Sequence, residues 1–131
     1  AKLTKNLLVL KKISLGVAFS WAAVILYVCL IRISEVPTIK IANFDKYIHA
    51  FFYFVFSALW FFALRLYFKK WSRNQVLGAV FLMSLLFGIA IELFQAFFTT
   101  YRSGDIADVF ANTAGTLLAL VSISILVKKS F

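Results

Sequence analysis

Three groups of polar residues interrupt stretches of the sequence that are otherwise apolar. Within each group the residues are three or four positions apart, so they share one face of a helix. The groups are Asp45, His49 and Tyr53; Glu92 and Gln95; and Asp105, Asp108 and Asn112. Carboxylates, an imidazole and amides arranged in this way are suited to proton transfer, metal coordination or hydrogen bonding to a polar ligand.

Glu92 and His49 are the residues least expected in an apolar environment. A charged side chain at the centre of a membrane helix costs about 2.5–3.5 kcal/mol on insertion scales, so each should face a partner inside the protein. We expect His49 to pair with Glu92, or Arg102 with one of the acids. His49 and Glu92 would form an acid–base pair, with Asp108 or Asp105 as a third group. An ion held by His49 and two or three carboxylates is compatible with the same residues. A purely structural pair is the alternative.

Two cations accompany the polar groups in the sequence, Lys46 and Arg102. Together with the amino termini of the helices that begin near Asp45 and Asp105, they could hold a phosphate. The structural alternatives are helix capping by the two aspartates and an interfacial position for the Lys46 ammonium.

Tyr53 and Asn112 each have two interpretations of equal weight. Tyr53 is either an interfacial aromatic residue or part of a site, since it lies two helical turns beyond Asp45. Asn112 either contacts a ligand or joins two helices, an interaction worth about 0.6–2 kcal/mol in membranes.

The elements that carry these residues are long apolar segments. Of 131 residues, 63% are hydrophobic and only 15% charged, whereas soluble domains average about 45–50% and 25%. This composition excludes an ordinary soluble protein. A membrane-spanning helix needs about 20 apolar residues, and four such segments are present, at 13–31, 48–64, 76–98 and 106–127. We predict one all-α membrane domain over residues 1–131, a compact bundle of four transmembrane helices.

The net charge of +9 is sorted along the chain. Most basic residues flank the predicted spans on one side: Lys2, Lys5, Lys11, Lys12, Arg65, Lys69, Lys70, Arg73, Lys128 and Lys129. All five acids and the polar groups fall on the other side. Because Lys and Arg gather in cytoplasmic segments, both termini should be cytoplasmic, with the polar groups facing outside the cell membrane. Charges in short helix flanks predict no nucleic-acid partner.

Small residues recur every four positions in the last span. The ridge they form lets a neighbouring backbone approach closely, either within the chain or across a homo-oligomer seam. It consists of Ala107, Ala111, Gly115 and Ala119. No cofactor is indicated by the sequence, and its metal content is left open.

The order and spacing of the polar residues resemble the VanZ-like family of bacterial membrane proteins. The motifs concerned are Asp45-Lys46-x-x-His49-x-x-x-Tyr53, Glu92-x-x-Gln95, Arg102-Ser103 and Asp108-x-x-x-Asn112-x-x-Gly115. The resemblance implies a polytopic envelope protein, and the family's founding member is associated with low-level resistance to the glycopeptide teicoplanin. It also implies that the family's shared polar residues correspond to Asp45, Lys46, His49, Tyr53, Glu92, Gln95, Arg102, Asp108, Asn112 and Gly115.

The leading hypothesis is a protein that binds or shields a membrane lipid in an outer-leaflet polar pocket. The lipid would be a lipid-linked cell-wall precursor or a phospholipid. The protein would thereby have a role in glycopeptide resistance. The candidate ligand-binding residues are Asp45, Lys46, His49, Tyr53, Glu92, Gln95, Arg102, Asp105, Asp108 and Asn112.

Two other classes of function remain open. One is a membrane-embedded enzyme acting on a lipid head group, with His49, Glu92 and Asp108 as catalytic residues. The other is a transporter or scramblase. A continuous polar pathway is disfavoured, because the inner halves of the spans offer only Ser57, Ser84, Ser122 and Ser124.

Overall fold

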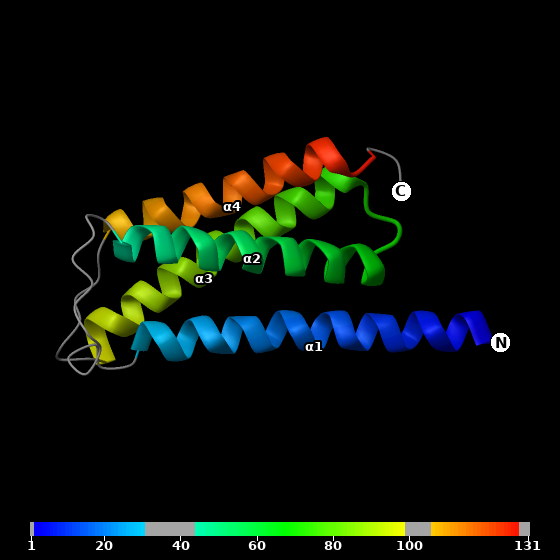
Figure 1. Cartoon of the computed structure of the whole chain (residues 1–131), viewed down its shortest axis with the longest axis horizontal. Helices are drawn as coiled ribbons and strands as arrows, with labels where there is room; N and C mark the ends of the chain where they lie inside the picture. The colour runs from blue at the N-terminus through cyan, green and yellow to red at the C-terminus, as the bar shows by residue number, and fades with distance from the viewer. Residues whose placement is uncertain (1, 31–43, 99–105, 129–131) are drawn as a thin grey trace.

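The structure is a computed structural model that describes residues 2–30, 44–98 and 106–128. It contains four helices (Figure 1): α1 (Lys2–Leu30), α2 (Phe44–Tyr67), α3 (Arg73–Phe98) and α4 (Ile106–Leu126). All four are long and apolar enough to cross a membrane. The predicted all-α bundle of four transmembrane helices is therefore confirmed.

The first helix is longer than the predicted span. It begins at Lys2 and not near residue 13, because the lysine-rich head contains good helix formers and no Pro or Gly. The other three helices begin and end within a few residues of the predicted spans.

Helix α2 is the central element of the bundle. It packs most extensively against α4 and also contacts α1 and α3, whereas α1 contacts only α2 and α3 among the described residues. Helices α2 and α4 begin at the end of the bundle where α1 and α3 finish (Figure 1). We call this end the site end and the opposite one the basic end.

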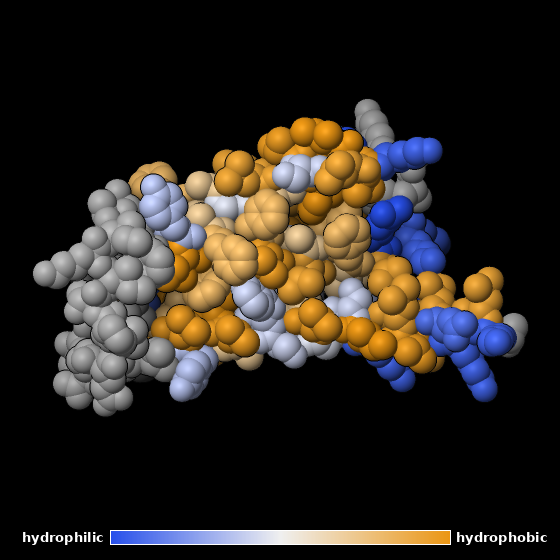
Figure 2. Space-filling model, in the orientation of Figure 1, coloured by the Kyte–Doolittle hydropathy of each residue, from blue (hydrophilic) through white to orange (hydrophobic). Residues whose placement is uncertain are grey.

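The basic end gathers most of the positive charge. The start of α1, the turn between α2 and α3 and the end of α4 meet there, and Figure 2 shows hydrophilic residues clustered on this side of an otherwise apolar surface. The structure thus places the described basic flanks at one end, as the charge pattern requires. That this end is cytoplasmic stays a prediction.

The turn at the basic end is fixed by local hydrogen bonds. Ser72 and Gln75 form a capping box at the start of α3: the Ser72 N–H donates to Gln75 Oε1 (2.8 Å), and the Gln75 N–H donates to Ser72 Oγ (3.2 Å). Arg73 Nη1 donates to the carbonyls of Ser124 (2.9 Å) and Val127 (3.0 Å). These bonds tie the start of α3 to the carboxyl end of α4, where a cation is favoured.

Aromatic side chains fill the core between α2 and α3. Phe56 and Phe87 stack at 5.0 Å with an interplanar angle of 8°, Tyr53 packs against both, and Trp60 lies beside Phe56. Many large apolar side chains of all four helices instead point outwards, as expected of a surface that faces lipid.

The backbones of α2 and α4 approach each other closely at Gly115. A Cβ atom added there would lie 2.0 Å from the Ala50 carbonyl oxygen. Gly115 and Ala119 are buried within the chain, whereas Ala107 at the start of the ridge is exposed. The buried part of the small-residue ridge therefore serves packing within one chain, and an oligomer seam stays a prediction.

Candidate functional site

The candidate site lies at the site end, where three helices each contribute an ionisable side chain. His49 comes from α2, Glu92 from α3 and Asp108 from α4, with exposed fractions of 6%, 7% and 9%. One ligand atom of each lies within 4.8 Å of those of the other two. We call these residues the triad. The structure thus brings together one member of each polar group found in the sequence.

The hydrogen bonds of His49 run to α4. His49 Nδ1 lies 3.0 Å from Asn112 Oδ1, and Nε2 lies 3.6 Å from Asp108 Oδ2. Because the amide oxygen is an acceptor, Nδ1 carries the proton and Nε2 is turned towards the carboxylate. Ligand atoms of His49 and Glu92 lie within 4.8 Å of each other, so the two residues that were expected to pair are neighbours, and the hydrogen bond described for His49 is the one to Asn112.

Lys46 is an integral part of the cluster. Its ammonium donates to Asp108 Oδ1 and so bridges α2 and α4 one turn before His49. The Lys46 side chain is 23% exposed, so it reaches from the molecular surface to a buried carboxylate. The alternative of an isolated interfacial charge is thereby replaced by a specific ion pair.

Tyr53 lies one turn deeper than His49 and is fully buried, with an exposed fraction of 0%. Its hydroxyl has no hydrogen-bond partner among the described residues. A Cβ atom built on Gly88 would lie 3.6 Å from Tyr53 Oη and 3.0 Å from Asn112 Nδ2, so both side chains border the Gly88 backbone. Tyr53 is therefore an interior residue of the bundle and not part of an interfacial aromatic belt.

Gln95 serves a different contact from its neighbour Glu92. Its Nε2 donates to the carbonyl of Cys29 at 2.6 Å and so links α3 to the end of α1. Cys29 itself is buried, as expected of a small apolar residue. The described contact of Gln95 is thus structural.

Three of the predicted site residues lie outside what the structure describes. These are the side chain of Asp45 and the whole of Arg102 and Asp105. Their proposed contacts stay predictions.

A polar column continues from the triad towards the middle of the bundle, and one of its residues, Thr116, was not predicted from the sequence. Ser84 and Thr116 share a hydrogen bond between α3 and α4, and Ser57 is fully buried. Polar or small residues thus recur every four positions on all three helices: His49, Tyr53 and Ser57; Asp108, Asn112 and Thr116; and Glu92, Gly88 and Ser84. This i, i+4, i+8 register is the signal that would have found Thr116.

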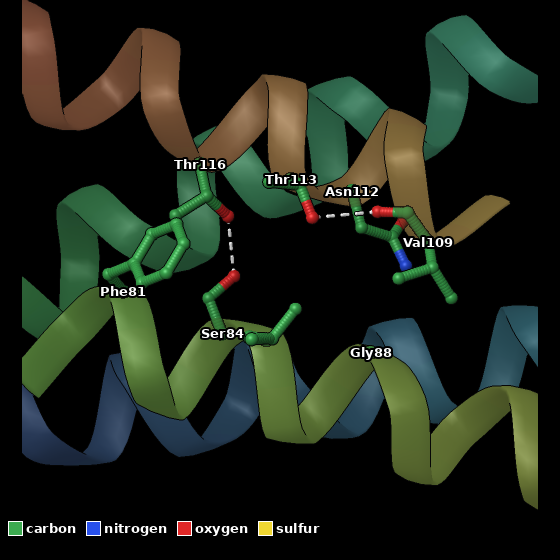
Figure 3. Close-up of a pocket in the computed structure, with 8 residues that line it drawn as sticks. Phe81, Ser84, Gly88, Val109, Asn112, Thr113 and Thr116 are labelled. Atoms are coloured by element: carbon green, nitrogen blue, oxygen red, sulfur yellow. Dashed lines mark hydrogen bonds between the residues drawn. The ribbon is translucent and has the colours of Figure 1, made fainter. Parts of the chain in front are cut away.

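A shallow groove between α3 and α4 follows the column (Figure 3). Ser84 and Thr116 lie opposite each other across it, with Asn112 further towards the site end. Towards the basic end, the buried core of the described residues is formed chiefly by large apolar side chains: Trp60, Phe61, Val76, Val80 and Ile123. The groove is too shallow to enclose a lipid head group.

The fold and the site define a small polytopic α-helical membrane protein with a buried polar cluster at one end. A family model described as VanZ/LLP1 matches residues 4–127, and the chain belongs to this family. The match extends over all four helices, beyond the residues that carry the resemblance. Neither the curated proteins nor the solved structures gave a match.

Proposed function

We propose that this protein binds the phosphate-bearing head group of a membrane lipid at the site end of the bundle. The lipid is a phospholipid or a lipid-linked cell-wall precursor in the outer leaflet of the plasma membrane. The observation that carries the proposal is the convergence of Lys46, His49, Glu92 and Asp108 at one end of an otherwise apolar bundle. Ionisable groups in a membrane domain are costly and are by default functional.

The charges at the site end suit an amphiphile whose head lies at the membrane interface. The partly exposed Lys46 ammonium and the amino termini of α2 and α4 favour an anion. Deeper in the cluster, the carboxylates of Glu92 and Asp108 would accept hydrogen bonds from hydroxyl, amide or ammonium groups of the head. The acyl chains of the lipid would pack against the apolar outer faces of the helices.

Membership of the VanZ/LLP1 family supports a connection to glycopeptide resistance. Glycopeptides bind the peptide stem of cell-wall precursors, so a protein that binds or shields such a precursor would change its exposure to the antibiotic. Teicoplanin susceptibility of a host strain with and without the chain measures this effect. We expect lower susceptibility in its presence and loss of that effect in His49→Ala.

Photo-crosslinking to a lipid probe in membranes tests the binding site itself. We expect His49→Ala and Lys46→Met to reduce crosslinking about ten- to hundredfold, because each removes a hydrogen bond that involves a charged or buried group. Ser57→Ala is the matched control, since Ser57 is a buried polar residue of α2 two turns deeper than His49. Crosslinking that is equal in the wild type and in both site variants would refute the proposal.

An acid–base enzyme acting on the head group is the second candidate. The specific observation in its favour is that His49 Nε2 faces Asp108 while Nδ1 is held by Asn112, an orientation that suits proton transfer. Release of a soluble product from head-group-labelled lipid, abolished in Glu92→Gln, would establish it. Unchanged lipid after prolonged incubation would exclude it for the lipid tested.

A further inference from the structure

We propose that the triad of His49, Glu92 and Asp108 is a binding site for one divalent transition-metal ion of the Zn²⁺ type. The metal site is independent of the proposed lipid ligand. Only the role of the ion in holding the head group rests on the proposed function.

Two possible ligand atoms, His49 Nε2 and Asp108 Oδ2, face each other inside the triad. His49 Nδ1 faces the Asn112 oxygen, an acceptor, so whenever the imidazole is neutral the lone pair of Nε2 is directed towards Asp108 Oδ2. The separation of 3.6 Å exceeds the 2.7–3.2 Å of an ordinary N–H···O hydrogen bond. Two ligands of a tetrahedral ion with bonds of about 2.0–2.1 Å lie roughly 3.4 Å apart. The observed spacing therefore suits a shared metal ion better than a shared proton.

Outer partners hold both of these residues in place. Asn112 binds Nδ1 of His49, and Lys46 binds Oδ1 of Asp108, which leaves Nε2 and Oδ2 directed towards each other. Metal ligands in proteins are oriented in this way by outer partners, whose loss typically reduces affinity about 10- to 100-fold. Lys46 therefore supports the site, since it occupies the other oxygen of the carboxylate.

The donor set points to the kind of ion. One imidazole and two carboxylates suit Zn²⁺ or Mn²⁺, whereas Mg²⁺ and Ca²⁺ prefer oxygen ligands alone. Three protein ligands leave a fourth position for water or a substrate oxygen, as in catalytic zinc sites. The Tyr53 hydroxyl, fully buried and without a partner among the described residues, borders the same Gly88 backbone as the Asn112 amide. It offers a hydrogen bond to a polar group that enters the cluster.

A metal ion would also explain how an acidic cluster accepts a phosphate. The two carboxylates of the triad repel an anion, and Lys46 already neutralises one of them. A divalent ion bound between them would offer its open position to a phosphate oxygen. In this arrangement the head group contacts Lys46 and the ion together.

Metal content of the purified full chain, freed of any affinity tag, tests the site. After dialysis against buffered Zn²⁺, we expect about one Zn²⁺ per wild-type chain, at least tenfold weaker binding in His49→Ala, Glu92→Gln and Asp108→Asn, and unchanged binding in Ser57→Ala. Co²⁺ substitution in the wild type should give the intense visible absorption of a four-coordinate ion, which requires no variant to fold. Zn²⁺ content equal in the wild type and His49→Ala, or a six-coordinate Co²⁺ spectrum, would overturn the proposal.

Lipid crosslinking before and after chelation separates this proposal from the preceding one. A metal-free protein that crosslinks lipid as well as the loaded protein would leave the head-group site standing and remove the ion from it. Stoichiometric Zn²⁺ binding without any lipid crosslinking would establish the metal site and refute the head-group proposal.

Discussion

Asp108 is the residue on which the cluster depends, because its two oxygens serve two partners from α2. One oxygen accepts from Lys46 and the other faces His49. A buried carboxylate in an apolar bundle is tolerated only with such partners, and removal of one partner costs more than removal of the pair. The Lys46–Asp108 pair therefore contributes to the α2–α4 interface as well as to the site.

Replacement of Lys46 by Met should lower the free energy of unfolding in detergent by about 1–3 kcal/mol, because a carboxylate is left with fewer partners. The double variant Lys46→Met/Asp108→Asn should recover part of that loss. A chemical or thermal unfolding series on the single and double variants measures the coupling. Strictly additive losses would contradict a direct interaction between the two residues.

The convergence of His49, Glu92 and Asp108 could be predicted from the sequence, but the contact of His49 with Asn112 could not. Helical spacing placed each of His49, Glu92 and Asp108 on a polar face of its own span. Their positions along the spans placed them at one depth, and a polar face in an apolar span is expected to turn towards the protein interior. The partner of His49 depends on how α2 and α4 are rotated about their axes. The two backbones meet at Gly115 and Ala50, and the small-residue pattern around Gly115 does not reveal which helix it contacts.

At the scale of the elements, the approach of α2 to α4 positions the site. Glycine at 115 allows the helix backbones to meet, and this contact sets Lys46 and His49 opposite Asp108 and Asn112. A small residue at such a crossing is a common device in membrane bundles. The ridge was visible in the sequence, but its partner helix was not.

Gly115→Ala should destabilise the bundle by about 1–3 kcal/mol, since the new methyl group would lie 2.0 Å from the Ala50 carbonyl oxygen and force the helices apart. Gly78→Ala is the matched control, because no atom lies within 4 Å of its Cβ position. In that helix interior, alanine should be neutral or stabilising by up to about 1 kcal/mol. Thermal unfolding of both variants measures the contrast, and equal stability would contradict the close contact.

Gly88→Ala should affect the site more than the fold. Its methyl group would lie 3.0 Å from Asn112 Nδ2, so the amide must shift and its bond to His49 must weaken. We expect lipid crosslinking to fall about tenfold, with a smaller loss of stability than in Gly115→Ala. Crosslinking at the wild-type level would show that Asn112 does not need its present position.

At the scale of the whole molecule, charge and polarity are divided between the two ends of the bundle. The described basic residues that flank the helices lie at the basic end, while the described buried acids lie at the site end. Composition and periodicity were sufficient to predict four spanning helices. Helix α1 extends beyond the predicted span at its amino end, because hydropathy reports where a helix is apolar, not where it begins.

The topology can be measured with cysteine variants in a Cys29→Ala background, which keeps the Cys29 carbonyl that Gln95 binds. We expect a membrane-impermeant thiol reagent to label Asn74→Cys and Lys128→Cys only after cells are opened, and Thr38→Cys in intact cells. The reverse pattern would place the site end in the cytoplasm and contradict an outer-leaflet ligand.

Native mass spectrometry of the intact protein released from membranes shows directly whether the cluster at the site end holds a lipid head group. We predict that the wild type and Ser57→Ala each retain one phosphate-bearing lipid, and that His49→Ala loses it at the same collision energy. Equal lipid retention by the wild type and His49→Ala, or no retained lipid in either, would show that the cluster does not hold the head group.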